Sequence, residues 1–380
     1  MRVLIATVTA GAGHLQAAAA LEEAWREFRP ADEVLRSDVL AFTSALYRKS
    51  YSTGYVKVVE RAPELYGLLF RKADNPALLR KVTRVRRWLA ALPADKFVRH
   101  VRKFRPDLIL STHFMPPEVL GGSRTYRDQT RPPLVTVVTD FEAHALWLEP
   151  SVDTYCVATE QTAARFLARG VPAEKVRVTG IPIARRFSQP VDVPGFHKRM
   201  GWREDLPLLL VLGGGFGMGP VREVLDQVCR TELPLQVAVV CGRNEELRRS
   251  LAGRDYALPV HVLGFVSNMQ ELMASSVMVV TKPGGLTTAE ALALGKPLLI
   301  VNPIPGQEAA NSDFLLEHGA AAKVNCLEDL PFKLKEVLAV RRLKALSHAA
   351  AGLGRPDATR QVCLAALACH ALKTSQVPGG

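Results

Sequence analysis

No stretch of this sequence is long and apolar enough to span a lipid bilayer. A membrane-spanning helix needs about 18 consecutive apolar residues, and the 380 residues contain no such run. Any association with a membrane is therefore expected to be peripheral. The apolar opening of residues 1–14 merges into a Gly loop and an amphipathic helix, which predicts a first strand rather than a signal peptide.

Cysteine pairs and metal-binding motifs are also missing. The six cysteines are scattered, without Cys-x-x-Cys pairs or histidines at metal-ligand spacing. This pattern indicates neither a disulfide framework nor a zinc site, and it fits a reducing cytoplasm. The sequence contains no Asp-x-Asp motif, so we predict no metal site, no required cation and no cofactor.

Length and periodicity predict two domains. One domain usually takes roughly 100 to 200 residues, and 48% of these 380 residues are apolar. Buried-type strands alternate with helical stretches along the chain, which is typical of an α/β protein with doubly wound sheets. Residues 184–207 combine Pro, Gly and charge without periodicity, and we place the linker there.

Positive charge is concentrated in one segment. The net charge is +12, and between Arg48 and Lys103 fifteen basic residues stand against four acidic ones, a net charge of +11. The rest of the chain is close to neutral, so this segment is predicted to bind a partner.

Residues 42–88 interleave these charges with Tyr, Leu and Phe in a helical pattern. Such a surface suits the headgroup region of an anionic membrane. The phosphates of a nucleic acid would attract the same cations, and a solvated helix pair covering the domain is a third interpretation. The cations assigned to the membrane are Arg80, Lys81, Arg84, Arg86 and Arg87.

Residues 277–311 predict a nucleotide site. They read as a buried strand, a Lys-Pro-Gly-Gly turn, a helix over residues 287–294, a second strand and a polar loop. Gly284 and Gly285 allow a ligand close to the backbone, and the helix start offers N–H groups that attract phosphate. Residues 207–219 repeat the order of strand, Gly-rich loop and helix, and the glycines assigned to phosphate are Gly213, Gly214, Gly215 and Gly217.

Polar residues beyond the turn extend this site. Glu290 lies one turn into the helix, at the depth of a ribose, and Gln307, Glu308 and Asn311 follow the next strand as readers of sugar hydroxyls. The three features together describe a nucleotide that carries a sugar. The alternative is a plain Gly turn with Glu290 in solvent.

Titratable residues follow three strands of the first domain. His14 lies at a junction of loop and helix, His113 and Asp140 end strands, and His144 and Trp147 come just after. Ligands bind at the carboxyl ends of parallel strands, so we expect the three histidines and Asp140 along one rim. A helix N-terminus disfavours a positive imidazole, which keeps His14 neutral and able to accept a proton. The alternative is a helix-capping or packing histidine.

An ordered set of motifs resembles one known family. The motifs are GAGH (11–14), STHF (111–114), TDFEAHALW (139–147), GGGFGMG (213–219), GFVSNM (264–269), TKPGGLTTAE (281–290) and PGQEAAN (305–311). They are similar to those of GT-B glycosyltransferases that include MurG and, more closely, the monogalactosyl and glucosyl diacylglycerol synthases. The resemblance implies two Rossmann-like doubly wound domains facing a cleft. Residues 1–190 would bind acceptor and membrane, residues 200–355 would bind the UDP-sugar, and a last helix at 356–374 would pack back on the first domain.

The resemblance also implies a reaction. An inverting transferase would move a hexose from UDP-glucose or UDP-galactose to diacylglycerol, giving a β-glycosyl diacylglycerol, as a peripheral protein on the cytoplasmic face of the cell membrane. His14 would be the general base, with Asp140 as the second catalytic candidate. His113, His144 and Trp147 would lie on the acceptor side. The donor would contact the backbone at Gly284, Gly285, Leu286 and Thr287 and, for uracil, at Phe265 and Val266.

Two other interpretations stay open on the sequence. A polyprenyl-linked acceptor, as used by MurG, is ranked lower because the MurG-like GGTGGH is here AGAGH and because Trp147 and the TDF segment match the diacylglycerol enzymes better. A non-catalytic protein that binds anionic lipid or nucleic acid on the same fold is the other. The intact Glu290, Gln307, Glu308 and Asn311 count against it, and no nucleic-acid partner is expected.

Overall fold

The computed structural model describes residues 1–9, 11–45, 47–48, 62–75, 95–123, 131–213 and 219–375. The chain divides into two compact units. The first unit comprises Met1–Arg185, Pro305–Gln307 and Asp357–Gly380, and the second comprises Arg186–Ile304 and Glu308–Pro356.

The first unit is built on a six-stranded parallel sheet in the order β2-β1-β3-β4-β5-β6. Its strands are β1 (Arg2–Thr7), β2 (Glu33–Asp38), β3 (Leu108–Ser111), β4 (Leu134–Val137), β5 (Thr154–Val157) and β6 (Val176–Val178). All residues of β3, β4 and β5 are buried. Helices cover both faces of such a sheet, which is why these strands read as apolar runs without alternation.

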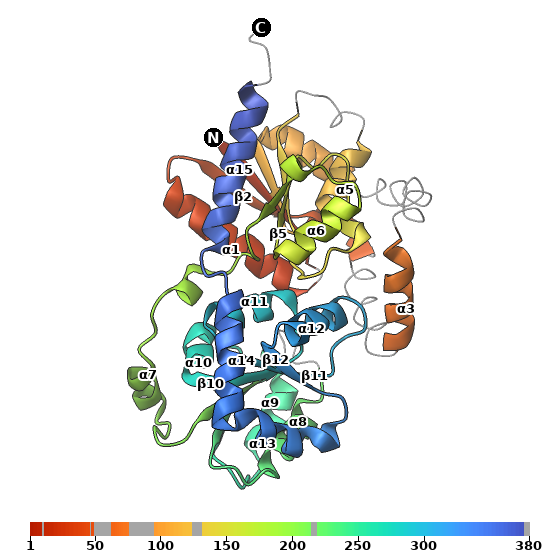
Figure 1. Ribbon diagram of the computed structural model, residues 1–380. Helices are drawn as coiled ribbons and strands as arrows, with labels where there is room; N and C mark the ends of the chain where they lie inside the picture. The colour runs from red at the N-terminus through yellow and green to blue at the C-terminus, as the bar shows by residue number, and fades with distance from the viewer. Residues whose placement is uncertain are drawn as a thin grey trace. The chain divides into compact units, whose positions relative to one another are not determined.

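Helices of the first unit include one from the far end of the chain. They are α1 (Ala12–Phe28), η1 (Val39–Phe42), α3 (Pro63–Ala73), α5 (Met115–Gly122), η3 (Ala145–Trp147), α6 (Glu160–Ala168), η4 (Ala173–Lys175) and α15 (Ala358–Ser375), and residues 95–104 are also helical. Helix α15 packs beside α1 (Figure 1). Val362, Cys363 and Ala366 of α15 share a buried cluster with Val3 and Ile5 of β1, so the last helix completes the core of the first unit.

The second unit has the same plan. Its six parallel strands run in the order β12-β11-β10-β7-β8-β9. They are β7 (Leu208–Leu212), β8 (Gln236–Val240), β9 (Val260–Leu263), β10 (Ser276–Thr281), β11 (Leu298–Val301) and β12 (Ala321–Val324). Its helical segments are α7 (Val193–Met200), α8 (Val221–Cys229), α9 (Glu245–Ala252), α10 (Met269–Ser275), α11 (Gly285–Ala293), α12 (Gln307–Glu317), η6 (Leu327–Asp329), α13 (Leu330–Leu338) and α14 (Val340–Leu353).

The segment predicted to be the linker contains regular structure. Residues 185–188 form η5 (Arg185–Ser188), and α7 follows. The Asp192 side chain accepts a hydrogen bond from the Gly195 N–H and caps the start of α7, while Gly201 ends it in a left-handed conformation with φ of 66°. The linker predicted for residues 184–207 therefore contains the unit boundary and also a helix, α7, whose eight residues are too few for a clear periodic signal.

The order of strands fixes where ligands can bind. In the first sheet the chain leaves β1 toward β2 but leaves β3 toward β4, and in the second it leaves β7 toward β8 but β10 toward β11. Each sheet therefore has a topological switch point, between β1 and β3 and between β7 and β10, where crevices form at the carboxyl ends of the strands. The two sheets confirm the predicted fold class, while the cleft stays a prediction.

Candidate active site

His14 lies at the switch point of the first sheet. It occupies the first turn of α1, which begins at Ala12 directly after the β1 loop. Its backbone carbonyl accepts hydrogen bonds from the hydroxyl groups of Thr7 (3.2 Å) and Thr112 (3.0 Å). Thr112 follows β3, so both strands of the switch point hold the first turn of the helix in place.

The contacts of the His14 ring determine which nitrogen carries the proton. Nδ1 lies 2.9 Å from the carbonyl oxygen of Thr112 and 2.9 Å from Oγ1 of Thr139. A carbonyl oxygen can only accept, so Nδ1 carries the hydrogen and the lone pair is on Nε2. This is the tautomer in which Nε2 can act as a base.

Burial keeps His14 uncharged. It lowers the pKa of His14 to about 4, although the hydrogen bond to Thr112 acts in the opposite direction. The predicted neutral imidazole is thus present, but its main cause is removal from water.

A buried histidine, His113, stands against His14, which is itself partly exposed. The ring of His113 makes an edge contact with that of His14, with centroids 4.6 Å apart. Nδ1 of His113 accepts the Met115 N–H at 3.0 Å, so its proton is on Nε2. Burial and the neighbouring His14 both lower the pKa of His113. Trp147 closes this cluster, with its ring centroid 6.4 Å from both imidazoles.

The other two predicted residues of this rim have different surroundings. Asp140 is partly buried at the carboxyl end of β4, next to Thr139, whose hydroxyl contacts His14. His144 is buried, and its Nε2–H donates to the carbonyl oxygen of Phe70 at 2.9 Å. His144 thus connects the loop after β4 to α3. Thr112 and Thr139 were missed by sequence reasoning, since hydroxyl residues at strand ends carry no distinctive signal.

The predicted phosphate turn lies at the switch point of the second sheet. It connects β10 to α11, which begins at Gly285, two residues earlier than predicted. The N–H groups of the first helical turn have no partners within the helix and can face an anion. Gly284 has a φ of −65°, which any residue can adopt. A Cβ at this position would meet no atom within 4 Å and would project into the open space beside the helix start. Glycine here keeps the helix start uncovered.

Four predicted donor residues lie on α11, which follows this turn, and on α12, which follows the next strand. Asn311 is completely buried, and its Nδ2 donates to the Pro283 carbonyl at 3.0 Å, so it supports the turn. Oε2 of Glu308 accepts the Ile304 N–H at 2.8 Å. Burial raises the pKa of Glu308, although Lys282 and this hydrogen bond lower it. Burial also raises the pKa of Glu290, to about 8, against the attraction of Arg186. Gln307 is the first residue of α12.

The predicted uracil contacts follow β9. Phe265 is 64% exposed and Val266 is partly buried. The guanidinium of Arg243, which follows β8, lies over the Phe265 ring at 5.4 Å from its centroid. Sequence reasoning missed this cation. Gly213, at the end of β7, donates its N–H to the Val240 carbonyl at 3.3 Å, whereas Gly214, Gly215 and Gly217 lie outside the described residues.

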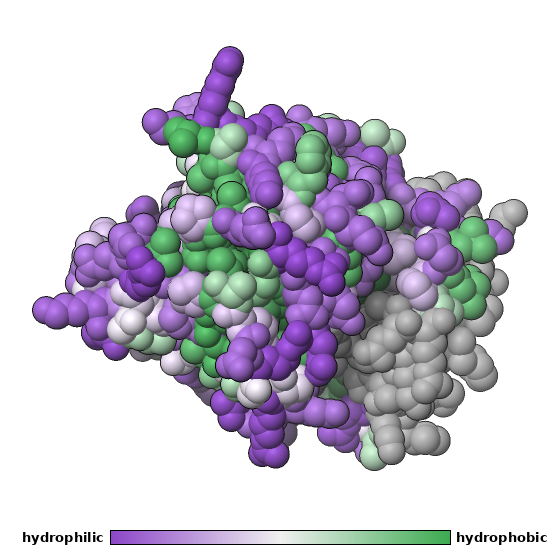
Figure 2. Space-filling model, turned by 90° about the horizontal axis from the view of Figure 1, so that it is seen from below, coloured by the Kyte–Doolittle hydropathy of each residue, from purple (hydrophilic) through white to green (hydrophobic). Residues whose placement is uncertain are grey.

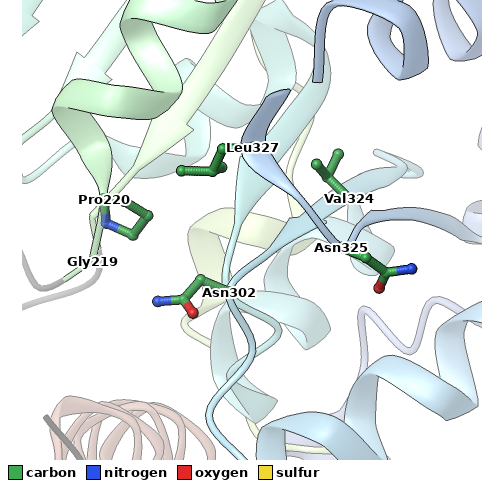
Figure 3. A pocket seen from close by; sticks show the side chains of 6 residues that line it. All are labelled: Gly219, Pro220, Asn302, Val324, Asn325 and Leu327. Carbon is green, nitrogen blue, oxygen red and sulfur yellow. The ribbon is translucent and has the colours of Figure 1, made fainter. Parts of the chain in front are cut away.

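A pocket of about 450 Å³ opens at the same edge of the second sheet. Asn302 and Asn325 come directly after β11 and β12, and Gly219 and Pro220 precede α8. In Figure 3 the Asn302 amide extends on the side of Pro220, whereas the Asn325 amide points away from it. The lining residues are Gly219, Pro220, Asn302, Val324, Asn325 and Leu327. Sequence reasoning singled out none of the residues on the β11 and β12 side.

Only part of the basic segment can be placed. Arg80, Lys81, Arg84, Arg86 and Arg87 lie outside the described residues. Within the described part, α3 is helical as predicted, with Arg71 and Lys72 in its last turn. No helix among the described residues is long and apolar enough to cross a bilayer.

Two family models match this chain, one on each side of residues 184–207, where the linker was predicted. Residues 14–183 match the model for monogalactosyldiacylglycerol (MGDG) synthase, and residues 208–361 match the glycosyltransferase family 28 C-terminal domain. The chain is 29% identical over 389 residues to the processive diacylglycerol beta-glucosyltransferase of Bacillus cereus (strain AH187), covering 99% of this chain and 96% of that protein.

Solved structures give the fold. MurG of Acinetobacter baumannii superposes with a TM-score of 0.64 at 15% identity, covering 97% of this chain and 99% of MurG. The calicheamicin glycosyltransferase CalG4 gives a TM-score of 0.63 at 16% identity, with 99% of both chains covered. The resemblance to MurG and the monogalactosyldiacylglycerol synthases is thereby confirmed, and the chain has the GT-B fold of these glycosyltransferases.

Proposed function

We propose that this protein transfers a hexose from a UDP-sugar to diacylglycerol with inversion, giving a β-glycosyl diacylglycerol. The observation that carries the proposal is the neutral His14, whose Nδ1–H is held by Thr112 and whose Nε2 carries the lone pair. The two matching family models and the diacylglycerol glucosyltransferase relatives support the substrate classes. They favour diacylglycerol over the polyprenyl-linked acceptor.

His14 acts in this proposal as the general base. Nε2 takes the proton of the acceptor hydroxyl while the hydroxyl oxygen attacks the anomeric carbon and UDP leaves from the opposite face. An imidazole that is already neutral needs no prior loss of a proton. The contacts to Thr112 and Thr139 keep the ring in one tautomer and one orientation, and Asp140 stays the second candidate for the base.

The donor binds at the second switch point. The N–H groups of Gly285, Leu286 and Thr287 meet the diphosphate, and their partial positive charge stabilises the departing UDP without a required cation. Glu290 accepts hydrogen bonds from the ribose hydroxyls. Uracil lies against Phe265 and Val266, and Glu308 and Gln307 read the hexose. UDP-glucose is proposed ahead of UDP-galactose because the relatives are named glucosyltransferases.

The acceptor is drawn from the cytoplasmic face of the cell membrane, where the protein binds peripherally. Helix α3 supplies an apolar face for this contact. Leu65, Leu68 and Leu69 are 52%, 43% and 55% exposed, and with Lys72 they follow the spacing of one helix face. Figure 2 shows hydrophobic residues among hydrophilic ones at its right-hand edge, where α3 lies in Figure 1. Apolar and cationic groups together fit an anionic bilayer surface.

The direct test is mass spectrometry of lipids formed from diacylglycerol with each UDP-sugar in turn. We expect a hexosyl diacylglycerol with UDP-glucose and release of one UDP for each hexose added. Glycolipid formed only with a polyprenyl-linked acceptor would move the protein to the MurG type. Absence of UDP release with every acceptor and donor would refute the transferase and favour the lipid- or nucleic-acid-binding alternative.

A further inference from the structure

Helix α3 is fastened to the loop that follows β4 by its C-terminal turn. The guanidinium of Arg169, at the end of α6, donates from both terminal nitrogens to the Asp74 carboxylate, at 2.8 and 2.7 Å. The same carboxylate accepts the Ala145 N–H at 2.8 Å. Burial acts to raise the pKa of Asp74, but the hydrogen bonds from Arg169 and Ala145 outweigh it and lower this pKa. A single carboxylate thus joins α3, α6 and η3.

His144 makes a second contact between the same elements. Its Nε2–H donates to the Phe70 carbonyl in the last turn of α3, and its Nδ1 accepts the Leu146 N–H at 3.1 Å. Both bonds require the neutral tautomer with the proton on Nε2. The Phe70 ring packs on the imidazole, with centroids 4.0 Å apart and planes 37° apart.

The fastening is close to the catalytic cluster. Ala145 and Trp147 belong to the same short helix, η3, and the Trp147 ring contacts those of His14 and His113. Helix α6 holds the start of this loop independently, because Thr162 Oγ1 donates to the Phe141 carbonyl at 2.6 Å. A displacement of α3 would therefore reach Trp147 through Asp74 and Ala145, while residue 141 stays anchored.

We propose that Asp74, His144 and Arg169 form a joint that transmits the docking of α3 on an anionic lipid bilayer to the loop of residues 140–147, and so places Trp147 against His14. The proposal rests on the proposed function, because it assigns α3 to the membrane surface that supplies the acceptor. Asp74, His144 and Arg169 are positioning residues in this scheme. They do not contact the reacting atoms.

The test compares Asp74→Asn and Arg169→Gln with the parent on two acceptor forms. Diacylglycerol is presented in vesicles of phosphatidylglycerol and phosphatidylcholine, or dispersed in detergent micelles. We expect each substitution to lower kcat/KM on vesicles by at least tenfold and on micelles by less than threefold, with sedimentation on the same vesicles retained. The double variant should be no worse than either single variant, because the shared interaction is lost only once.

The chain offers a matched control. Arg131 binds Asp153 through both terminal nitrogens at 2.6 and 3.0 Å, and Asp153 also accepts the Leu134 N–H at 2.8 Å. Asp153→Asn removes the same kind of contact at the amino-terminal edge of the same sheet, together with the ion pair of Asp153 with Lys373 at 3.2 Å. We expect this variant to lower vesicle and micelle activity equally. An equal loss for Asp74→Asn would show that the joint is only structural and would overturn the proposal.

Hydrogen exchange separates this proposal from the proposed function, since it needs no turnover. Adding the anionic vesicles should slow exchange in a peptide containing residues 145–147 in the parent but not in Asp74→Asn. If the parent forms no glycolipid, the proposed function fails and this measurement still decides the joint. Identical protection in both proteins would overturn it. Loss of α3 exposure through dimerisation of the chain, or through binding of RNA instead of vesicles, would overturn the assignment of α3 to the bilayer.

Discussion

Replacing Glu290 with Gln should make the second unit more stable, and the gain should grow with pH. Burial raises the pKa of Glu290 from 4.5 to about 8 in the folded protein. Between these values Glu290 is ionised in the unfolded chain and protonated in the folded protein. Stability is therefore highest below pH 4.5 and is lost as the pH rises toward 8. A difference of one pKa unit corresponds to about 1.4 kcal/mol. Relative to its value below pH 4.5, the free energy of unfolding is therefore lowered by about 3 kcal/mol at pH 7 and by about 5 kcal/mol above pH 8.

Gln has nearly the same shape and no charge, so Glu290→Gln removes this cost. The assay is urea unfolding at pH 5, 7 and 9, followed by circular dichroism and by tryptophan emission, to which Trp202 contributes from a buried position in the second unit. The difference between variant and parent should rise from below about 1 kcal/mol at pH 5 to several kcal/mol at pH 9. Glu317→Gln, at an exposed position of the same unit, serves as the control. A difference that does not change with pH would refute the reasoning.

Glu290→Gln should also weaken the binding of UDP. Ribose hydroxyls that donate to the carboxylate favour its ionised form, so binding of UDP near pH 7 should release a proton from Glu290. Calorimetry in buffers of different ionisation enthalpy measures that proton. Glu290→Gln should abolish the release and cost about 1 to 3 kcal/mol of UDP binding. Equal UDP affinity in both proteins would place Glu290 away from the ribose.

His14→Ala should lower turnover by about 10² to 10⁴-fold with UDP affinity unchanged in calorimetry, and activity within threefold of the parent would shift the base to His113 or Asp140. Since the pKa of His14 is lowered to about 4, the acid limb of kcat/KM should fall near pH 4, and a limb near pH 6.5 would contradict a base whose pKa is lowered by desolvation. Activity should persist in EDTA, because helix N–H groups meet the diphosphate. Gln at all of Arg80, Lys81, Arg84, Arg86 and Arg87 should lower vesicle binding and activity on vesicles but not activity on micelles. Each of these cations contributes about 1 kcal/mol at an anionic surface. Salt-dependent binding of RNA or DNA in place of vesicles would identify another partner.

The positions of the site residues could be predicted because they depend on strand ends. A buried apolar run followed by glycine or a polar group marks the carboxyl end of a parallel strand, and this reasoning located His14, His113 and Gly284. It could not find Thr112 or Thr139, since neither residue type stands out at a strand end. Both hold the His14 ring through contacts that span 98 and 125 residues of sequence.

The charge states of the site residues were harder to predict from the sequence than their positions. Local sequence suggested a helix N-terminus as the reason for a neutral His14, whereas burial is the main cause. Burial depends on everything packed around the ring, including Trp147, and cannot be read from a window of neighbours. The same limit applies to α7, since eight residues with Pro194 and Gly195 near the start carry too weak a period to distinguish a helix from a linker.

Burial removes the charge of His14 and of Glu290, but the chemical consequences are opposite. For His14 the neutral form is the reactive one, so burial prepares the base before any substrate arrives. For Glu290 the neutral form is a resting state, and ionisation becomes favourable when donors such as ribose hydroxyls replace the missing water. The stability lost to this partly buried carboxyl group is therefore tied to ligand recognition. A ligand without neighbouring hydroxyl groups cannot stabilise the carboxylate and would leave the unfavourable group in place.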